Sequence, residues 1–329
     1  MALVARLTTN VPETEPEDIM ASALGVIFPD DITNQHGDPS HGLIYTSPHL
    51  PKPLHIKLAD PTADEDRSLF GHYLWNSSLL LAELVEAGTL KLDAASAPHT
   101  AALAAPAQHS DKPVRTAPLS DFNVAGLSTI ELGAGTALPS LMATLLGARR
   151  VVVTDYPAPV NMEVLRHNVA ANTQPSLSPS GQIAALDLSS GGGGIEVEGH
   201  GWGELDDTPL ARENRHAFDR VFVADCLWMP WQHDNLRQSV AWFLGDGPDA
   251  RALIVAGFHT GREKMRGFFD AEALAAQGLE VESIWERDCD SIDREWVLDR
   301  GLEDPGVRKR WLAVAVLRRA LRGNEDQTR

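Results

Sequence analysis

Four residues near the middle of the chain have the types and spacing of a small-molecule site. The stretch Glu131-Leu-Gly133-Ala-Gly135 follows an apolar run, and Asp155 ends the next apolar run, 22 residues after Gly133. Glycines permit a tight turn and remove side chains where a ligand approaches the backbone. A carboxylate at the second position can accept hydrogen bonds from both hydroxyl groups of a ribose. The pattern therefore predicts a site for a ligand that contains adenosine.

The residues after the glycines discriminate between ligands of this kind. The dinucleotide fingerprint G-x-G-x-x-G/A needs a small residue at its sixth position, but Leu138 stands there and Pro139 follows it. The small residue, Ala137, comes one place earlier, and no Gly-Lys-Ser/Thr follows, which excludes a P-loop. Glu131 is more typical of S-adenosylmethionine binders than of NAD binders, and it would either hold the loop or face the positive methionine part. The pattern thus favours S-adenosylmethionine as the cofactor.

Alternating strands and helices are predicted to position these residues. Strands are expected over 127–132, 150–154, 183–188, 218–225, 251–257, 279–287 and 310–318, and helices over 137–146, 159–172, 231–244 and 262–275. This order predicts an α/β fold with a Rossmann-like, mostly parallel sheet of seven strands and helices on both faces. No clear helix separates the last two strands, so the last strand is expected to run antiparallel. Ligands bind beyond the carboxyl ends of such strands, where Gly133, Gly135 and Asp155 fall.

Other segments fall outside this alternation. Residues 1–68 are irregular and are expected to form an N-terminal extension that packs on the core, with a strand over 54–58. Residues 69–329 are expected to form the cofactor-binding domain. Within it, the stretches 91–126 and 189–217 are rich in small and polar residues and are predicted to be insertions or loops.

Composition restricts the partners and the compartment. The net charge of −18 disfavours nucleic acid and favours a small molecule or a basic protein. No apolar run approaches the length of about 18 residues that spans a membrane. Two cysteines, Cys226 and Cys289, form no CxxC pair or Cys/His cluster, so neither a disulfide framework nor a metal site is expected. We expect a cytoplasmic protein, with the nucleus as a further location; the sequence carries no signal for its oligomeric state.

Several of these stretches also resemble a known family. The chain resembles the family 16 seven-β-strand methyltransferases, and among them the nicotinamide N-methyltransferase-like and the elongation-factor N-terminal and lysine methyltransferases. The resemblance covers roughly residues 68–320 and is most specific over 131–168. The stretches that carry it are Gly71-His-Tyr-Leu-Trp75-Asn, Glu131-Leu-Gly-Ala-Gly-Thr-Ala-Leu-Pro-Ser, Val151-Val-Val-Thr-Asp155-Tyr-Pro and Leu165-Arg-His-Asn168. It implies a class I methyltransferase fold with S-adenosyl-L-methionine as cofactor.

The resemblance implies cofactor-binding roles by position. The matching residues are Trp75, Glu131, Gly133, Gly135, Asp155 and Trp202. Trp75 would line the cofactor pocket, Trp202 would stack beside the adenine, and Asp187 would lie near the adenine. The alternative for Trp202 is a loop residue that covers the surface. The alternative for Trp75 is a core residue on an amphipathic helix that begins near Leu69.

The substrate side departs from the family. Protein-lysine members carry Asp-x-x-Tyr or Asp-x-x-Phe after the fourth strand, whereas this chain has Asp225-Cys-Leu-Trp228. Trp228 and Trp231 are expected to bind substrate as an aromatic wall for a flat ring or an alkylammonium group, or else to pack at the sheet edge. The resemblance places His259 beside the substrate, where a neutral imidazole can take a proton from an amine; a structural histidine is the alternative. Asp225 and His259 are therefore the expected catalytic residues.

These observations favour an S-adenosylmethionine-dependent N-methyltransferase that acts on an amine or ring nitrogen of a protein or a small molecule. The acidic surface and the resemblance suit a basic protein substrate, whereas Trp228 and the N-terminal extension suit a small molecule. One alternative is a non-methylating or non-catalytic protein that retains the methyltransferase fold and cofactor site. Another is a dehydrogenase, which would bind NAD. Calorimetric titration with S-adenosylmethionine and its demethylated product would separate these hypotheses.

Overall fold

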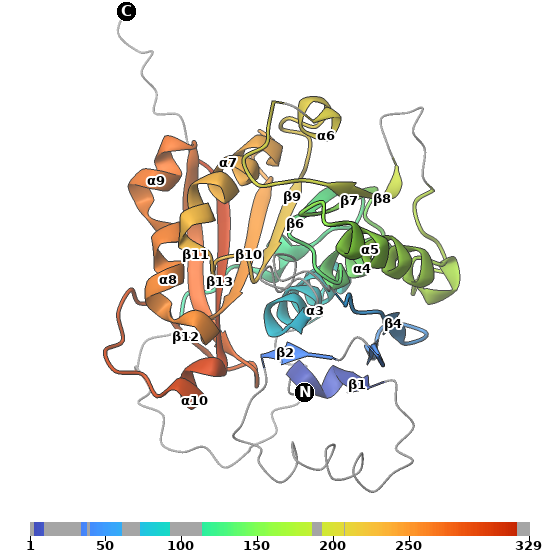
Figure 1. Ribbon diagram of the computed structural model, residues 1–329, viewed down its shortest axis with the longest axis horizontal. Helices are drawn as coiled ribbons and strands as arrows, with labels where there is room; N and C mark the ends of the chain where they lie inside the picture. The colour runs from blue at the N-terminus through green and yellow to red at the C-terminus, as the bar shows by residue number, and fades with distance from the viewer. Residues whose placement is uncertain are drawn as a thin grey trace, which may run out of the picture.

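A central sheet of eight strands organises the protein (Figure 1). The computed structural model describes residues 3–9, 34–37, 40–60, 73–92, 114–185, 193–206 and 208–320. The strand order is β12-β11-β13-β10-β9-β6-β7-β8. The strands are β6 (Ser128–Leu132), β7 (Arg150–Asp155), β8 (Gly194–Gly199), β9 (Arg220–Ala224), β10 (Arg251–Gly257), β11 (Leu279–Asp288), β12 (Asp293–Glu295) and β13 (Trp311–Arg319). Strands β6 to β10 are parallel, and β13 runs antiparallel to β10 and β11, which confirms the predicted α/β fold and its antiparallel last strand. The described sheet has eight strands instead of the predicted seven, because the short strand β12 pairs with β11.

Helices cover both faces because the inner strands are apolar on both sides. On β10, Leu253 and Val255 pack into one hydrophobic core, and Ile254 and Ala256 pack into the other. The first core includes α3 (Asn76–Leu90), α4 (Leu138–Leu145) and α5 (Pro159–Asn172). The second includes α6 (Pro209–Glu213), α7 (His233–Phe243), α8 (Arg262–Arg266) and α9 (Ala271–Ala276). Successive side chains of a strand point to opposite faces, so each buried strand contributes to both cores.

The third strand of the parallel set lies later in the sequence than predicted. Residues 183–185 are not in a strand, and the edge strand beside β7 is β8, within the stretch predicted to be a loop. The run over 183–188 is more apolar, but β8 alternates Ile195 and Val197, which pack on the core, with two glutamates. An edge strand needs only one apolar face, so alternation was the correct signal. The predicted loop 189–217 therefore contains both β8 and α6.

Three other segments differ from the prediction. Helix α3 begins at Asn76, and Trp75 belongs to the short strand β5 (Leu74–Trp75), so Trp75 is not a core residue of the helix. The helix predicted over 262–275 is divided into α8 and α9 by a short 3-10 helix. The part of the predicted 91–126 insertion from residue 114 onwards is folded, because Phe122 is fully buried beside Trp285. Among the described residues, no helix is long and apolar enough to cross a membrane.

The N-terminal extension packs on the core through a small antiparallel sheet. Its strands are β1 (Leu7–Thr9), β3 (Leu43–Tyr45) and β4 (Leu54–Ile56), and Figure 1 shows β1, β2 and β4 next to α3 at one end of the molecule. The Arg6 guanidinium binds Glu83 and Glu86 of α3, each at 2.8 Å. Another short strand, β2 (Gln35–His36), pairs with β5 and so fixes the backbone of Trp75. The extension therefore supports one wall of the region described below.

Two asparagines of α5 continue the hydrogen bonding of β4. The Asn168 side chain accepts from the Lys57 N–H at 2.8 Å and donates to the Lys57 carbonyl at 3.0 Å. The Asn172 side chain likewise accepts from the His55 N–H and donates to the His55 carbonyl, two residues earlier in the chain. Asn168 also donates to the Thr136 carbonyl at 3.3 Å, directly after the glycine loop. Residues four apart share a helix face, so the pair fastens the extension to the loop.

Replacing Asn168 by alanine is expected to lower the free energy of unfolding by about 3 kcal/mol, because three backbone groups lose a buried partner at about 1 kcal/mol each. Urea denaturation followed by circular dichroism measures this change. The exposed neighbour His167 provides the control, since His167→Ala should change stability by less than about 0.5 kcal/mol. Equal stability of the two variants would contradict the assigned role of Asn168.

Candidate active site

The carboxyl ends of the parallel strands enclose a cavity of about 440 Å³. Its walls come from the loops after β6, β7, β8 and β9, together with the segment before α3. The lining residues used below are Trp75, Gly133, Gly135, Thr136, Asp155, Tyr156, His200, Trp202, Asp225, Cys226 and Trp228. Parallel strands deliver the ends of successive βα units to one edge of the sheet. The cavity therefore collects residues that lie more than 150 positions apart in the sequence.

The glycine loop bends sharply along one wall of the cavity. Gly133, Gly135 and Ala137 have φ angles of +70°, +55° and +67°. A Cβ atom on Gly133 would lie 2.8 Å from Cys226 Sγ and 3.0 Å from Trp202 Cζ2. Gly133 is thus required both by its conformation and by the close approach of the Trp202 indole.

Replacing Gly133 by alanine is expected to destabilise the protein by about 3 kcal/mol, because a positive φ costs about 1–2 kcal/mol and the clash adds to it. It should also abolish detectable binding of S-adenosylmethionine, since Trp202 has to move. Gly181 is a matched control, with φ +68° and nothing within 4 Å of an added Cβ. Gly181→Ala should show only the cost of the backbone conformation. Urea denaturation and calorimetry compare the two, and equal destabilisation would show that the contact with Trp202 is unimportant.

Glu131 lies behind the loop and does not line the cavity. It is fully buried, and its carboxyl group accepts from the backbone N–H and the hydroxyl of Ser140 in the first turn of α4. Burial raises the pKa of Glu131 to about 8, although the hydrogen bonds from Ser140 oppose this. The sequence left two roles open for Glu131, which were to hold the glycine loop or to face the ligand. The geometry favours the first, because the carboxyl group binds Ser140 and does not reach the cavity.

Asp155 lines the cavity from the end of β7. Its Oδ2 accepts from the Gly135 N–H at 2.7 Å, and the side chain also accepts from the backbone of Tyr156. Burial raises the pKa of Asp155 to about 6, and these two hydrogen bonds oppose the rise. The carboxyl group is thus held in one orientation beside the glycine loop. It retains acceptor capacity for a ligand.

The loop after β8 forms the opposite wall. The Trp202 indole lies over Gly133, so Trp202 faces the cavity instead of only covering the surface. The backbone N–H of His200 donates to the Asp155 carbonyl at 2.9 Å, which fixes this loop to the end of β7. Asp187, which the sequence placed near the adenine, lies outside the described residues.

Asp225 and His259 meet at the ends of β9 and β10. His259 Nε2 lies 3.0 Å from Asp225 Oδ2, and Asp225 Oδ1 accepts from the Gly257 N–H at 3.0 Å. The ring of Trp75 stacks on His259 with centroids 4.7 Å apart. Burial lowers the pKa of His259, but the charge and hydrogen bond of Asp225 outweigh burial and raise it. Asp225 lines the cavity, whereas His259 lies behind it; the sequence had placed both beside the substrate.

The two tryptophans after β9 occupy different positions. Trp228 lines the cavity, and Trp231 is 71% exposed outside it. Their rings meet edge to face, with centroids 6.4 Å apart. The structure therefore places Trp228 at the cavity and Trp231 beside it in solvent, and their role in binding substrate stays a prediction.

Sequence reasoning missed several lining residues. Thr136, Tyr156 and His200 line the cavity, and each lies within two residues of a predicted site residue. Their positions next to Gly135, Asp155 and Trp202 in the sequence could have indicated that they line the same cavity. Thr136 is buried and its hydroxyl oxygen has no hydrogen-bond partner among the described residues.

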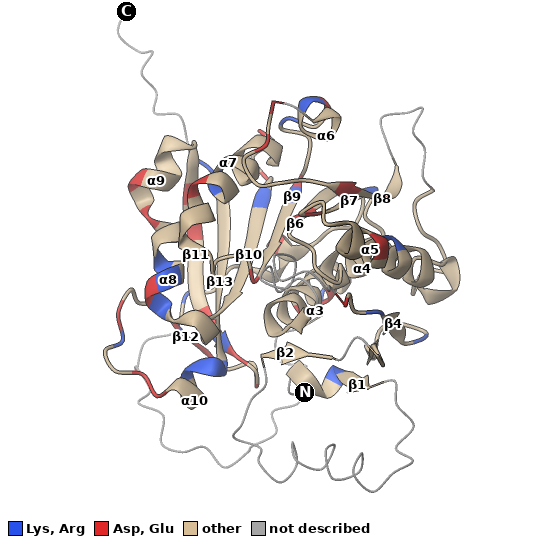
Figure 2. Ribbon diagram, viewed as in Figure 1, with Lys and Arg blue, Asp and Glu red and all other residues tan. Residues whose placement is uncertain are grey.

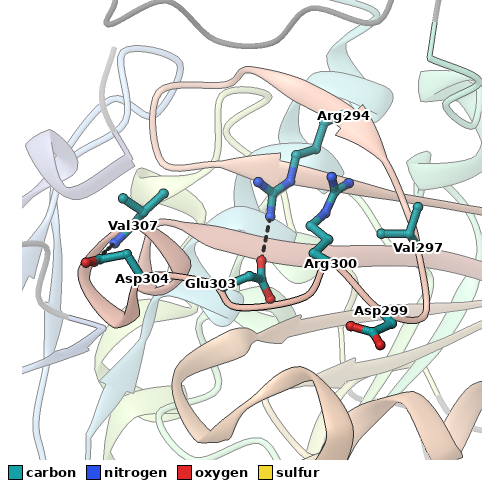
Figure 3. A pocket seen from close by; sticks show the side chains of 7 residues that line it. All are labelled: Arg294, Val297, Asp299, Arg300, Glu303, Asp304 and Val307. Atoms are coloured by element: carbon teal, nitrogen blue, oxygen red, sulfur yellow. Dashed lines mark hydrogen bonds and ion pairs between the residues drawn. The ribbon is translucent and has the colours of Figure 1, made fainter.

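A second hollow lies between β12 and α10 (Pro305–Lys309), and Figure 3 shows Arg294 and Arg300 on one side of it. Behind it, the fully buried Glu286 binds Arg262 and Arg294, each at 2.6 Å. Figure 2 shows that α8 and α10 contain Lys and Arg residues. The charges of the hollow are largely neutralised within the protein, so they serve to hold this segment in place.

This segment supports the position of His259. The Trp296 ring stacks on Phe258 with centroids 6.0 Å apart, and Phe258 begins the 3-10 helix η6 (Phe258–Thr260) that carries His259. Arg262 lies over the Phe258 ring at 4.2 Å. The polar group Arg294-Glu-Trp296, for which the sequence gave no role, thus anchors the element that carries His259.

The residues of the cavity fit S-adenosylmethionine. Gly135 lines the wall beside Asp155 without a side chain, and Asp155 offers carboxylate oxygens. The Thr136 hydroxyl has no hydrogen-bond partner among the described residues. Trp202 offers an aromatic surface beside the glycine loop. Among the described residues, no three His, Cys, Asp or Glu side chains are grouped as a metal site would need.

Comparisons with known proteins identify a family and several relatives. A family model described as lysine methyltransferase matches residues 62–272. The protein N-terminal and lysine N-methyltransferase EFM7 of Gibberella zeae is 29% identical over 252 residues, which cover 73% of this chain and 75% of that protein. The EFM7 protein of Eremothecium gossypii is 31% identical over 225 residues, covering 66% of each. A solved structure, a putative SAM-dependent methyltransferase from Streptococcus mutans, aligns with a TM-score of 0.46 at 11% identity and covers 92% of this chain and 64% of that one.

The sheet and the matching family define an S-adenosylmethionine-dependent N-methyltransferase. The chain belongs to the lysine methyltransferase family, since the family model covers more than half of it. This membership confirms the predicted enzyme class and cofactor. It decides against the dehydrogenase that the sequence had left as an alternative.

Proposed function

We propose that this enzyme methylates an amine of a basic protein, and that Asp225 is the residue that meets the amine. The observation that carries this proposal is the Asp225–His259 pair at the cavity wall, beside Trp75 and Trp228. The relatives in Gibberella zeae and Eremothecium gossypii are named as methyltransferases of protein N-termini and lysines, which supports a protein substrate. The net charge of −18 supports attraction of a basic partner.

We propose the following roles for the cofactor-binding residues. Asp155 accepts the ribose hydroxyls, Gly133 and Gly135 let the ligand approach the backbone, and Trp202 provides a surface for the adenine. Trp75 closes the side of the cavity next to His259, and Glu131 keeps the loop in shape from behind. Each role is supported by the position of the residue described above. When bound, the cofactor supplies an electrophilic methyl group on a sulfonium centre.

The protein's own contribution is orientation and proton handling. An amine attacks only when its nitrogen lone pair is free, so the site must orient an N–H bond and accept a proton. Asp225 offers a carboxylate at the cavity wall, held by the Gly257 N–H and by His259. His259 acts as a positioning residue, because it touches Asp225 instead of the cavity. Trp75 and Trp228 exclude water from the amine and face its positive charge.

The experiment that tests this proposal separates the products by size. The enzyme is incubated with radiolabelled S-adenosylmethionine and a cell extract divided into macromolecules and small molecules. We expect label in protein, and acid hydrolysis should release it as a methylated amine of lysine or of an N-terminal residue. The Asp225→Asn variant serves as the control for enzyme-dependent label. Label confined to the small-molecule fraction would contradict the proposal.

A small-molecule acceptor is the second candidate, and one observation favours it. Trp228 stands where protein-lysine relatives of the family carry a smaller ring, and with Trp231 it forms an edge-to-face pair. Such a wall suits a flat aromatic ring. Label in the small-molecule fraction of the same experiment would identify this outcome.

We also propose that the enzyme acts in the cytoplasm, with the nucleus as a further location. Its two cysteines, Cys226 and Cys289, are buried and unpaired, which supports a reducing compartment. Immunodetection in fractionated cells would test this. Recovery of the protein in a secreted or vesicular fraction would contradict it.

A further inference from the structure

The loop after β8 carries a buried histidine whose position is fixed on two sides. His200 is 2% exposed and follows directly after β8, at the cavity wall. Its backbone N–H donates to the Asp155 carbonyl at 2.9 Å. Its ring meets Phe243 of α7 edge to face, with centroids 5.2 Å apart. The ring is therefore held beside the residue that we assign to the ribose.

Ser239 of α7 is the hydrogen-bond partner of His200 Nε2. Ser239 Oγ accepts from the Gly203 N–H at 2.9 Å and lies 3.1 Å from His200 Nε2. A serine hydroxyl has one hydrogen to donate. If it donates to Nε2, then the Gly203 N–H, the hydroxyl and Nε2 are all satisfied. In this arrangement the ring hydrogen is on Nδ1.

The Nδ1 side of the ring has no partner within the described part of the chain, although the atom is buried. Burial lowers the pKa of His200 to about 4, so the ring is neutral near pH 7 and Nδ1–H is an uncharged donor. Buried polar groups in proteins nearly always have a hydrogen-bond partner. Since His200 lines the cavity, the partner is expected to come from the ligand.

We propose that His200 donates its Nδ1–H to a ring nitrogen of the cofactor's adenine, and that Ser239 fixes the tautomer that makes this possible. The adenine follows the ribose, so it lies next to Asp155 on the side of Trp202 and His200. Its edge carries ring nitrogens that accept hydrogen bonds. The inference rests on the assignment of this cavity to S-adenosylmethionine, and it adds a residue that recognises the base.

Two substitutions at position 200 separate the two ring nitrogens. In His200→Gln the amide reaches the Nε2 position and keeps a partner for Ser239, but the Nδ1 donor is lost. In His200→Asn the amide lies near the Nδ1 position and keeps a donor there. Both variants lose the ring contact with Phe243, so that loss cancels in the comparison. We expect S-adenosylhomocysteine to bind about tenfold more weakly to His200→Gln than to His200→Asn by calorimetry.

Analogues of the ligand identify the acceptor. We expect one of the 1-, 3- and 7-deaza forms of S-adenosylhomocysteine to bind wild type about tenfold more weakly than S-adenosylhomocysteine does. On His200→Gln, the same deaza form and S-adenosylhomocysteine should bind with equal affinity. Ser178→Ala is the control for a serine distant from the cavity, since Ser178 Oγ donates to the Leu145 carbonyl. It should bind like wild type, whereas Ser239→Ala should weaken binding. Equal losses for all analogues in wild type and His200→Gln would overturn the proposal.

Nitrogen-15 spectra of histidine-labelled wild type test the proposal without a substitution. We expect the Nδ1–H tautomer of His200 before ligand is added, and a shift of the Nδ1 resonance on addition of S-adenosylhomocysteine. The Nε2–H tautomer, or an unchanged Nδ1 resonance in the bound protein, would overturn it. Failure of wild type to bind the ligand at all would instead overturn the assignment of the cavity, which distinguishes the two failures.

Discussion

Replacing Asp155 by alanine is expected to weaken binding of S-adenosylmethionine about 100-fold, or about 2.7 kcal/mol. The carboxylate can accept both ribose hydroxyls in a buried site, where hydrogen bonds to a charged group contribute about 1.5–3 kcal/mol each. The substitution also removes the partner of the Gly135 N–H, which loosens the glycine loop. Isothermal titration calorimetry measures the dissociation constant directly.

The Asp155→Asn variant is the matched control. The amide oxygen still accepts from the Gly135 N–H, so the loop keeps its shape and only the charge and one acceptor are lost. We expect an affinity about tenfold below wild type, between that of wild type and that of Asp155→Ala. An alanine variant that binds as tightly as wild type would show that the ribose is placed elsewhere.

The same residue predicts how binding depends on pH. Burial raises the pKa of Asp155 to about 6, so the carboxyl group is protonated below that pH and loses acceptor capacity. The dissociation constant of the wild type should therefore rise by up to about tenfold per pH unit below pH 6. Asp155→Asn has no such titration and should lack this part of the profile. Parallel profiles for the two proteins would contradict the assignment.

Asp225→Asn is expected to lower kcat about 100-fold while the dissociation constant of S-adenosylmethionine changes less than about threefold, because a positioned proton acceptor contributes at least that much to rate. Asparagine is the suitable replacement, since Asp225 has a φ of +58° and asparagine adopts this conformation at a lower energetic cost than alanine. It also keeps an acceptor for the Gly257 N–H. Initial rates of methyl transfer to the labelled protein fraction, at saturating cofactor, measure the effect.

His259 provides a graded test of the same pair. His259→Gln retains a donor toward Asp225 and should lower kcat about tenfold, whereas His259→Ala should approach the loss of Asp225→Asn. If His259 had only a structural role, its substitutions would lower the stability of the protein. The kcat per folded molecule would then stay at the wild-type value. Full activity of Asp225→Asn would show that the amine meets another group.

The cofactor side of the site was largely predictable because it is local in sequence. Gly133, Gly135 and Asp155 occur at the ends of two neighbouring strands, and the order of strands and helices places those ends together. Glu131 was identified as well, but its two possible roles differ only by the direction of its side chain. That direction depends on Ser140, nine residues later in α4.

The edges of the fold were less predictable. The apolar run at 183–188 was preferred over β8 because a single sequence gives a stronger signal for a long apolar run than for the short alternation of an edge strand. The apolar periodicity predicts that Trp75 lies on a helix, whereas its backbone pairs with β2 in a short strand. That partner lies about 40 residues earlier in the chain, within an extension that shows little periodicity.

By itself, the sequence determined the α/β class, the glycine loop and the acid that follows the second strand, because turn conformations and apolar patterns are local properties. Only the tertiary structure decided that His259 stands behind Asp225, that Trp202 lies over Gly133, and that Ser239 meets His200. These contacts join segments that are 34 or more residues apart. Their geometry follows from strand order and from packing between loops, which residue types and spacing do not encode locally.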